Sequence, residues 1–542
     1  MSADGVTTAT SRPKCIPLLA IATIALIALP SFLSLIAHAA GDPAALAETW
    51  HALTSQERLA GLVSRSARIA FMSALWATFL GAPTAWVLCR WSPIGRRTLA
   101  ALAVLPALVP CYILAMGWHG ILGPVGSLRA NAPPWVPDLL TDMPLYTPAG
   151  VAFVLGCCTC PFALVAVSAA LLTTDREAEE AACVFRHPVI ALWAITGKPA
   201  CIAVLGGALL VMLVCMGEYS VPSLYQVNVY PVEIHMRISA FGDVNGATVL
   251  SLPLMLPAAP AIGLLLGTAA TFRRGKLSVT PMPSPAPWMR ALGTAWCATV
   301  VTFALLLPLG TLAWQTAALH SLGEAIRTCA PQITYSTLTA TATATATVLL
   351  GFLLVCALRN APPRLCLGAQ ALALTALLLP GTLHGLGIIK LWNRAGPCGW
   401  FYGSPAILVI AYLGRYLAIA LIPGLRAARN IPICLEEAAR AHGLSTRRIV
   451  TGVYFPLLRR VLSLEWLLIF ALTVAELNIA ILLAPPGFST LGVRLFTLLH
   501  YGMNTMVAAI ALVLMALGMG PLAIALLIDA SYRSVRHAQD RR

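Results

Sequence analysis

Charged side chains are scarce in this sequence of 542 residues. Asp, Glu, Lys and Arg together make up 10% of the chain, against about 25% in an average soluble domain, and hydrophobic residues reach 59%. A soluble globular fold is therefore excluded, because too few polar side chains are present to cover its surface. Binding to nucleic acid is excluded too, despite the formal net charge of +15, since no soluble fold is available to carry a basic face.

Motifs for covalent chemistry and for nucleotide hydrolysis are missing as well. No G-x-x-x-x-G-K-[ST] phosphate loop occurs, because the Gly-Lys pairs at 197 and 275 are followed by Pro199 and Leu277. No H-E-x-x-H sequence, nucleophile elbow or supported pair of acids points to a membrane-embedded enzyme. We expect this chain to bind no cofactor and no metal. Most of the 15 cysteines lie inside apolar runs, where they are expected to be small packing residues rather than disulfides or zinc ligands.

Long apolar runs are what the sequence has instead. A helix of about 20 apolar residues spans a bilayer. The runs predict about twelve such helices, near 17–40, 66–90, 98–122, 149–172, 200–222, 245–271, 291–317, 333–358, 367–392, 404–426, 461–484 and 504–530. The first run ends in Ala-His-Ala-Ala like a signal peptide, but its length of about 24 residues favours an uncleaved span. We therefore expect an all-α polytopic membrane protein, with two tandem six-helix repeats of the same orientation.

Two charged segments interrupt the apolar runs and resemble each other. The second, residues 436–456, reads EEAARAHGLSTRRIVTGVYFP and predicts a short helix to His442, a turn at Gly443 and a second helix closed by Pro456. The first, residues 179–199, reads EEAACVFRHPVIALWAITGKP. The two align at a constant offset of 257 residues, close to half of the chain. The sequence therefore indicates an internal duplication.

Each charged segment resembles the EAA loop of permease subunits in binding-protein-dependent ATP-binding-cassette (ABC) importers. The pattern is Glu-Ala-Ala, three residues, Gly, nine residues, an aliphatic residue, one residue, an apolar residue and Pro, and the second copy fits it throughout. The first copy has Arg186 in place of Gly and Thr196 in place of the aliphatic residue. The resemblance implies that each loop couples to an ATPase subunit. The matching residues are Glu180, Ala181, Ala182 and Pro199 in the first copy, and Glu437, Ala438, Ala439, Gly443, Val453, Phe455 and Pro456 in the second.

Further stretches look like the fused permeases of ferric iron importers: Leu105 to Gly126, Met216 to Tyr225, Leu379 to Arg394, and Ala475 to Gly502. This resemblance implies import of ferric iron from a periplasmic substrate-binding protein, driven by a separate ABC ATPase dimer that holds ATP and magnesium. Importers of thiamine, aminoethylphosphonate or polyamines have related permeases and stay open as alternatives. A secondary transporter is the alternative from a different class, although its repeats are often inverted.

The basic residues indicate how the spans are oriented. If the N-terminus is cytoplasmic, alternation of the spans puts 25 of the 35 Lys and Arg inside and nine outside, with Arg415 within a span. Both termini and both EAA loops should then face the cytoplasm of a bacterial inner membrane. The longer loops fall outside, where a binding protein could dock. The predicted division is a first half 1–272 with its EAA loop at 173–199, a Pro-rich cytoplasmic linker 273–290, and a second half 291–542 with its loop at 427–460.

A translocation path between the halves is the second predicted site. Glu218 and Glu476 lie 258 residues apart at matching span ends, Tyr219 follows the first, and Glu465 lies within a span. A carboxylate in hydrocarbon costs about 2.5–3.5 kcal/mol, so such residues usually face a cavity or a partner. Their oxygens would suit ferric iron. Alternatively, Glu218 and Glu476 pair with Arg415 or cap the loops beyond them. We expect loop or headgroup contacts for three lone residues near outer span ends: His119, His384 and Lys390.

Overall fold

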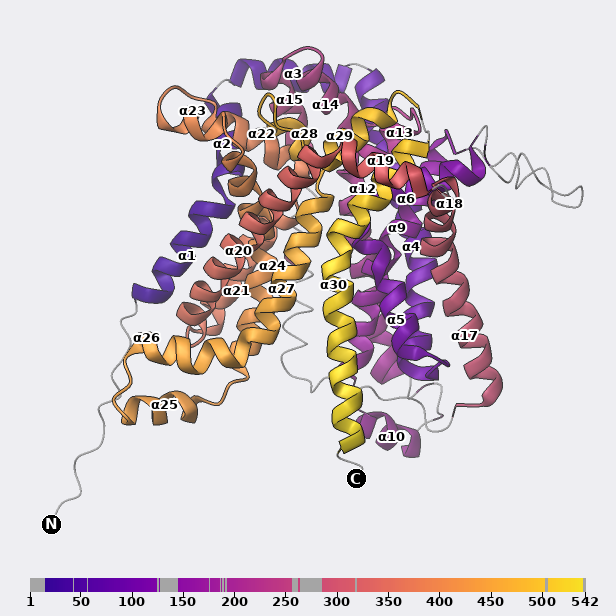
Figure 1. Ribbon diagram of the computed structural model, residues 1–542, viewed down its shortest axis with the longest axis vertical. Helices are drawn as coiled ribbons and strands as arrows, with labels where there is room; N and C mark the ends of the chain where they lie inside the picture. The colour runs from indigo at the N-terminus through magenta and orange to yellow at the C-terminus, as the bar shows by residue number, and fades with distance from the viewer. Residues whose placement is uncertain are drawn as a thin grey trace, which may run out of the picture.

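A computed structural model describes residues 15–41, 43–55, 57–123, 126, 145–174, 176–185, 187, 190, 193–255, 262–263, 285–316, 319–502 and 505–539. Every regular element in these ranges is a helix, and they contain no β-strand (Figure 1). The protein is an all-α polytopic membrane protein, as the sequence predicted.

The elements of the first half of the chain are α1 (Cys15–Ala28), α2 (Pro30–Gly41), α3 (Pro43–Ser55), α4 (Glu57–Trp86), η1 (Val87–Trp91), α5 (Arg96–Val104), η2 (Leu105–Ala107), α6 (Cys111–Leu122), α9 (Pro148–Leu172), α10 (Arg176–Phe185), η3 (Trp193–Gly197), α12 (Lys198–Met216), α13 (Ser220–Leu224), α14 (Tyr230–Ser239), α15 (Val244–Ser251) and η4 (Leu252–Met255).

The elements of the second half are α17 (Pro287–Val301), η5 (Thr302–Leu306), α18 (Leu307–Gln315), α19 (Leu319–Thr328), α20 (Ala330–Leu358), α21 (Pro363–Leu378), α22 (Gly381–Trp392), α23 (Pro397–Tyr402), α24 (Ala406–Arg429), α25 (Ile433–Ala441), α26 (Thr446–Ile449), η6 (Val450–Tyr454), α27 (Phe455–Ala475), α28 (Ala480–Leu483), α29 (Leu491–Leu499) and α30 (Thr505–Gln539).

Seven continuous helices in the described ranges are long and apolar enough to cross a bilayer, and counting three bent pairs as single spans raises the number to ten. Helix α27 is not among the seven; it carries Arg459, Arg460 and Glu465 within its 21 residues. Most of the predicted span 245–271 lies outside the described residues. The count of twelve therefore stays a prediction.

Two of the predicted spans are sharply broken rather than straight. The helical segments before and after Pro110 are bent by 99° to each other, and the same angle separates the helices before and after Pro380. Each proline is the N-cap of the following helix, α6 or α22. Proline restrains the preceding residue to extended backbone and cannot donate to the previous turn, so the chain turns where it stands. The breaks stand at corresponding places in the two halves.

The prediction that Pro456 closes a helix is wrong. Pro456 lies in the first turn of α27, and the chain enters it without interruption through the π-helical turn η6. The first half has the same arrangement: the π-helical turn η3 leads into α12, and Pro199 lies in the first turn of α12. A proline ring clashes with the carbonyl four residues earlier in an α-helix, and the wider π turn accommodates this. Both segments therefore connect rigidly to the long helices α12 and α27.

The long helices pack in the same way in both halves. In the first half α4 packs along α9 and α12, and in the second half α20 packs along α24 and α27. The counterparts follow one another in the same order, as expected for a duplicated chain. The boundaries predicted for the two halves are not tested by this packing.

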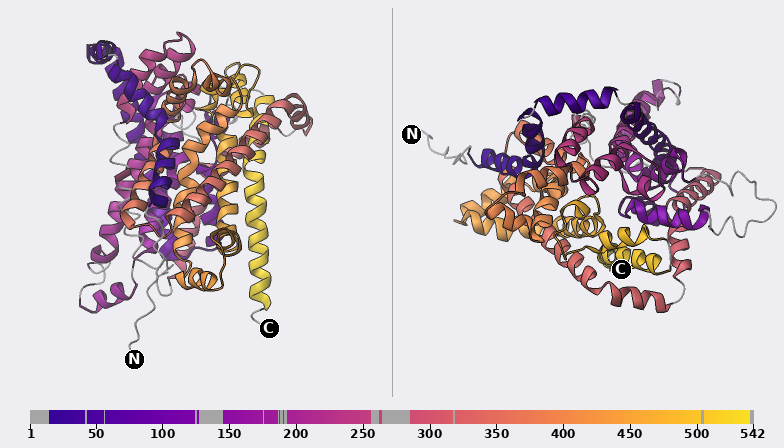
Figure 2. Two further views of the ribbon diagram at one scale, coloured as in Figure 1. Left: turned by 90° about the vertical axis from the view of Figure 1, so that its left-hand side faces the viewer. Right: turned by 90° about the horizontal axis from the view of Figure 1, so that it is seen from above.

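The two halves exchange their first helices, which the sequence did not predict. Helices α1 and α2 pack against α21 and α22, whereas α17 and α18 pack against α5 and α6 (Figure 2, right). A glycine permits each close approach: a Cβ on Gly387 of α22 would stand 2.0 Å from the Ser31 carbonyl oxygen, and one on Gly117 of α6 would stand 2.2 Å from that of Pro308. The halves are thus held together by reciprocal contacts.

Candidate functional site

The turn between α25 and α26 takes the conformation that the sequence predicted. Gly443 has φ of +74°, in the left-handed region that other residues enter at a cost of about 1–2 kcal/mol. Its N–H donates to the Arg440 carbonyl at 2.9 Å, and the Leu444 N–H donates to the Ala439 carbonyl at 3.1 Å. These two bonds form a Schellman motif that satisfies the last carbonyls of α25. The corresponding Arg186 lies outside the described residues.

Most of the residues matched to the EAA pattern lie on the outer surface of these segments. Glu437, Ala438, Gly443 and Pro456 are exposed in the second copy, whereas Ala439 is buried against the helix that follows. In the first copy Glu180, Ala181 and Pro199 are exposed and Ala182 is half-buried. Apolar Ile433 and Leu435 are exposed beside Glu437. The segment around α25 thus presents small, apolar and acidic groups outward.

The glutamate before each matched one makes an ion pair inside the fold, and the sequence reasoning missed its role. Glu436 is 4% exposed and receives bonds from Arg440 at 2.9 Å and from the Tyr454 hydroxyl. Arg359, at the end of α20, lies 3.8 Å from the carboxylate oxygen that accepts from Tyr454, and its guanidinium stacks over the Tyr454 ring at 4.6 Å. We call Glu436, Arg359 and Tyr454 the second clasp. It ties α25 to the end of α20 and to η6.

A first clasp occupies the corresponding place in the other half. Arg90 donates to both carboxylate oxygens of Glu179, at 2.6 and 2.8 Å, and its guanidinium is 5% exposed. Thr196 of η3 donates to the same carboxylate. Glu179 and Glu436 are 257 residues apart, which is the offset of the two EAA segments. That offset was the signal in the sequence, but it does not say which basic residue completes each pair.

The predicted path residues Glu218 and Glu476 lie at the opposite end of the molecule from α10 and α25, just before α13 and α28 (Figure 1). Glu476 accepts from the Tyr416 hydroxyl at 3.0 Å and from the Ile479 N–H at 3.2 Å, and Arg415 lies 3.9 Å away. Glu218 accepts from the Ser220 N–H at 2.9 Å and from its hydroxyl. Both carboxylates thus cap the chain that follows, as the alternative interpretation held.

Contacts across the halves bring the two carboxylates together. Gly217, next to Glu218, packs on Pro380, where a Cβ would stand 2.6 Å from the proline ring. A Cβ on the following Gly381 would stand 3.2 Å from a Glu476 carboxylate oxygen. Because residues at matching places in two repeats can meet only near the axis relating them, this cluster lies on that axis.

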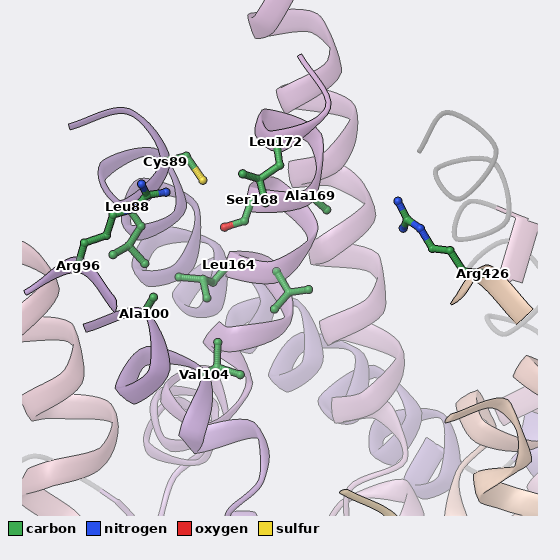
Figure 3. Close-up of a pocket in the computed structure, with 11 residues that line it drawn as sticks. Leu88, Cys89, Arg96, Ala100, Val104, Leu164, Ser168, Ala169, Leu172 and Arg426 are labelled. Atoms are coloured by element: carbon green, nitrogen blue, oxygen red, sulfur yellow. The ribbon is translucent and has the colours of Figure 1, made fainter. Parts of the chain in front are cut away.

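A cavity of about 530 Å³ lies between η1, α5 and α9 (Figure 3). Its walls are mostly apolar side chains of these elements, and Arg96 and Arg426 lie on opposite sides of it. Arg426, near the end of α24, is its one lining residue from the second half among those that the structure describes. We call the end with Glu218 and Glu476, where Tyr112 and Tyr219 are buried, the closed end, and the end with the cavity the hollow end.

Other polar residues singled out in the sequence lie apart from these sites. His384 is buried, not a loop or headgroup contact: its ring nitrogens bond the Ser31 hydroxyl at 3.1 Å and the Ala411 carbonyl at 2.9 Å. That correction follows from the exchanged helix α2, which covers α22. His119 contacts Tyr146, and Lys390 contacts Asn245. Glu465 is 4% exposed; it lies beside the Gly424 backbone and has no basic partner among the described residues.

The fold and these sites define a helical membrane protein of two similar, interlocked halves, with a closed acidic end and a hollow end. No protein-family model matches the chain. Over 173 residues it is 27% identical to the putrescine transport system permease protein PotI of Escherichia coli (strain K12). The aligned segment covers 31% of this chain and 60% of that protein. Over 196 residues it is 26% identical to the probable sulfate transport system permease protein cysT of Chlorokybus atmophyticus, covering 34% and 65%.

The matched segment spans less than two thirds of each relative. Because 173 residues are 60% of the first relative, that protein is about 290 residues long, little more than half of the 542 residues here. A relative of that size is about as long as one half of this chain. The similarity supports a transport permease and does not point to ferric iron.

Proposed function

We propose that this chain is the transmembrane permease subunit of a binding-protein-dependent ABC importer in a bacterial inner membrane. The observation that carries the proposal is the placement of the two EAA segments: α10 and α25 lie at one end of the molecule, at matching places in the two halves (Figure 1). An ATPase dimer offers two equivalent docking sites, so one copy of this chain would occupy both. The similarity to two transport-system permeases supports the same class.

The partners follow from this assignment. An ABC ATPase dimer, which holds the ATP and magnesium, would bind the exposed faces of α10 and α25 from the cytoplasm. A periplasmic substrate-binding protein would dock at the opposite end. The excess of basic residues on the side of α10 and α25 supports this orientation, with both termini in the cytoplasm.

The clasps convert movement of the ATPase into movement of the membrane helices. When the ATPase dimer closes on ATP, α10 and α25 are drawn toward each other, and the π turns η3 and η6 carry that movement into α12 and α27. The ion pairs of Glu179 with Arg90 and of Glu436 with Arg359 carry it into the ends of α4 and α20. Closing the hollow end would part the side chains that seal the other end and admit substrate.

The acidic end of the path favours a cationic substrate. Ferric iron is the substrate that the sequence resemblance implies, with Glu218, Tyr219 and Glu476 as passing oxygen contacts. A polyamine is the second candidate, favoured by the similarity to a putrescine permease. Permeases pass a substrate on, so neither candidate requires a site of high affinity in this chain.

Affinity purification from the native host tests the class. The tagged chain should bring down an ABC ATPase. Uptake into right-side-out vesicles, from which inside-out vesicles have been removed, should require ATP in the lumen and be blocked by vanadate. Substituting exposed Glu437 by Ala should abolish ATPase recovery while leaving the yield of folded permease unchanged. Uptake driven by an ion gradient without ATP would instead establish a secondary transporter.

A further inference from the structure

Two tyrosine hydroxyls near Glu218 and Glu476 have no hydrogen-bond partner among the residues that the structure describes. Tyr112 is 2% exposed and Tyr219 is 1% exposed, and each buries its hydroxyl oxygen without a partner. More than nine in ten buried polar groups in proteins are paired, and leaving one unpaired costs about as much as a lost hydrogen bond. Two such groups at one place indicate a polar site that another molecule completes.

The two tyrosines lie where the halves meet. Tyr112 comes from α6, and its hydroxyl would stand 3.3 Å from a Cβ built on Gly492 of the second half. Phe496 of α29 lies between the tyrosines, with ring centres 6.3 Å from Tyr112 and 5.7 Å from Tyr219. The Tyr112 hydroxyl also lies in the electrostatic field of Glu476 and Glu218. The unpaired hydroxyls thus belong to the same cluster as the carboxylates.

The charges of this cluster do not balance. Glu476 is countered by Arg415 at 3.9 Å. Glu218 accepts hydrogen bonds from Ser220 and from the Val221 N–H, and it has no basic partner within the part of the chain that the structure describes. His235, which stacks on Tyr219 at 4.8 Å, does not supply the missing charge, because burial lowers its pKa and His500 lowers it further. Glu218 therefore has no counter-ion among the described residues.

We propose that this cluster selects an organic cation, whose charged nitrogen passes Glu218, the hydroxyls of Tyr112 and Tyr219 and the ring of Phe496 when the closed end parts. Aromatic faces and a carboxylate suit a nitrogen cation. A hard metal ion prefers oxygen donors, and the ring of Phe496 beside the two tyrosines supplies none. The inference rests on the proposed importer function and narrows its substrate.

Isosteric variants separate this role from packing. Glu218→Gln keeps an oxygen to accept from Ser220 but removes the charge. Tyr112→Phe and Tyr219→Phe remove hydroxyls that make no bond, so a packing role predicts unchanged stability and unchanged transport. Glu324→Gln is the matched control, because Glu324 is an exposed carboxylate of α19 outside this cluster.

The test is uptake by native host cells that carry the full chain or a variant, compared with a deletion strain. The labelled probes are putrescine, spermidine, thiamine and choline as organic cations, with ferric citrate and sulfate for comparison. We expect uptake of at least one organic cation to depend on the chain, to fall about tenfold or more in Glu218→Gln, and to fall several-fold in the two Phe variants. Glu324→Gln should stay within about twofold of the unaltered chain.

The outcomes are decisive in both directions. If no organic cation depends on the chain, or if Glu218→Gln and both Phe variants transport normally, the inference is overturned. ATPase recovery with the same variants shows which proposal has failed. Normal ATPase recovery with chain-dependent uptake of ferric iron or sulfate would leave the importer function standing and remove only the organic cation.

Discussion

Removing the carboxylate of the second clasp should detach α25 from the membrane helices. In Glu436→Ala the buried Arg359, 6% exposed, loses its acidic partner, and the Tyr454 hydroxyl loses its acceptor. Removing one member of a buried ion pair typically costs about 3–5 kcal/mol, because the other charge stays buried without compensation. Arg359 keeps its bond of 2.7 Å to the Ile431 carbonyl, which favours the lower part of that range.

The control is its neighbour Glu437, which is exposed. Surface substitutions away from special features change stability by about 0.5 kcal/mol or less. Glu437→Ala should therefore keep the thermal stability of the purified permease and lose the ATPase, whereas Glu436→Ala should lose both. Thermal unfolding followed by size-exclusion chromatography, together with ATPase recovery, separates the two. Unchanged thermal stability in Glu436→Ala would refute the clasp.

Three further outcomes are expected. Gly443→Val should destabilise the permease by about 1–2 kcal/mol, because Val would have to adopt φ of +74°, and it should reduce ATPase recovery. Gly452→Val, in η6 with φ in the helical range, is the control. Equal ATPase recovery from the two variants would contradict the role of the Gly443 turn. Gly387→Val should lower thermal stability by about 1–3 kcal/mol or more through its clash with Ser31, and a stable variant would rule out the exchange of α2. Glu465→Leu should raise thermal stability by about 2 kcal/mol or more, since a buried carboxylate without a basic partner leaves hydrocarbon; a fall in stability would show that the contact with Gly424 outweighs this cost.

Local features of the second EAA segment could be predicted from the sequence, because they depend on neighbouring residues. Gly443 after a short amphipathic helix fixes the left-handed turn, and the helix before it follows from capping and composition. The all-α membrane fold follows in the same way from the length and composition of the apolar runs. The capping of the chain by Glu218 and Glu476 was also within reach, as one of two alternatives.

Features that depend on distant contacts could not be predicted. Arg359 lies far from Glu436 in the sequence, and nothing in either segment distinguishes it from other basic residues on the same side. The exchange of α1 and α2 escaped prediction because apolar runs carry little information on which neighbour they meet; His384 was misplaced for that reason. Pro456 was misread because the π turn that accommodates it has no simple sequence signature.

The most direct test of the account uses three cysteines that the chain already has. Cys183 of α10 and Cys434 of α25 are exposed at one end, and Cys398 of α23 is exposed at the other (Figure 1). A membrane-impermeant maleimide, read out by peptide mass spectrometry, should label Cys398 in right-side-out vesicles and Cys183 and Cys434 only in inside-out vesicles. Labelling of Cys183 or Cys434 in right-side-out vesicles would contradict docking of an ATPase from the cytoplasm.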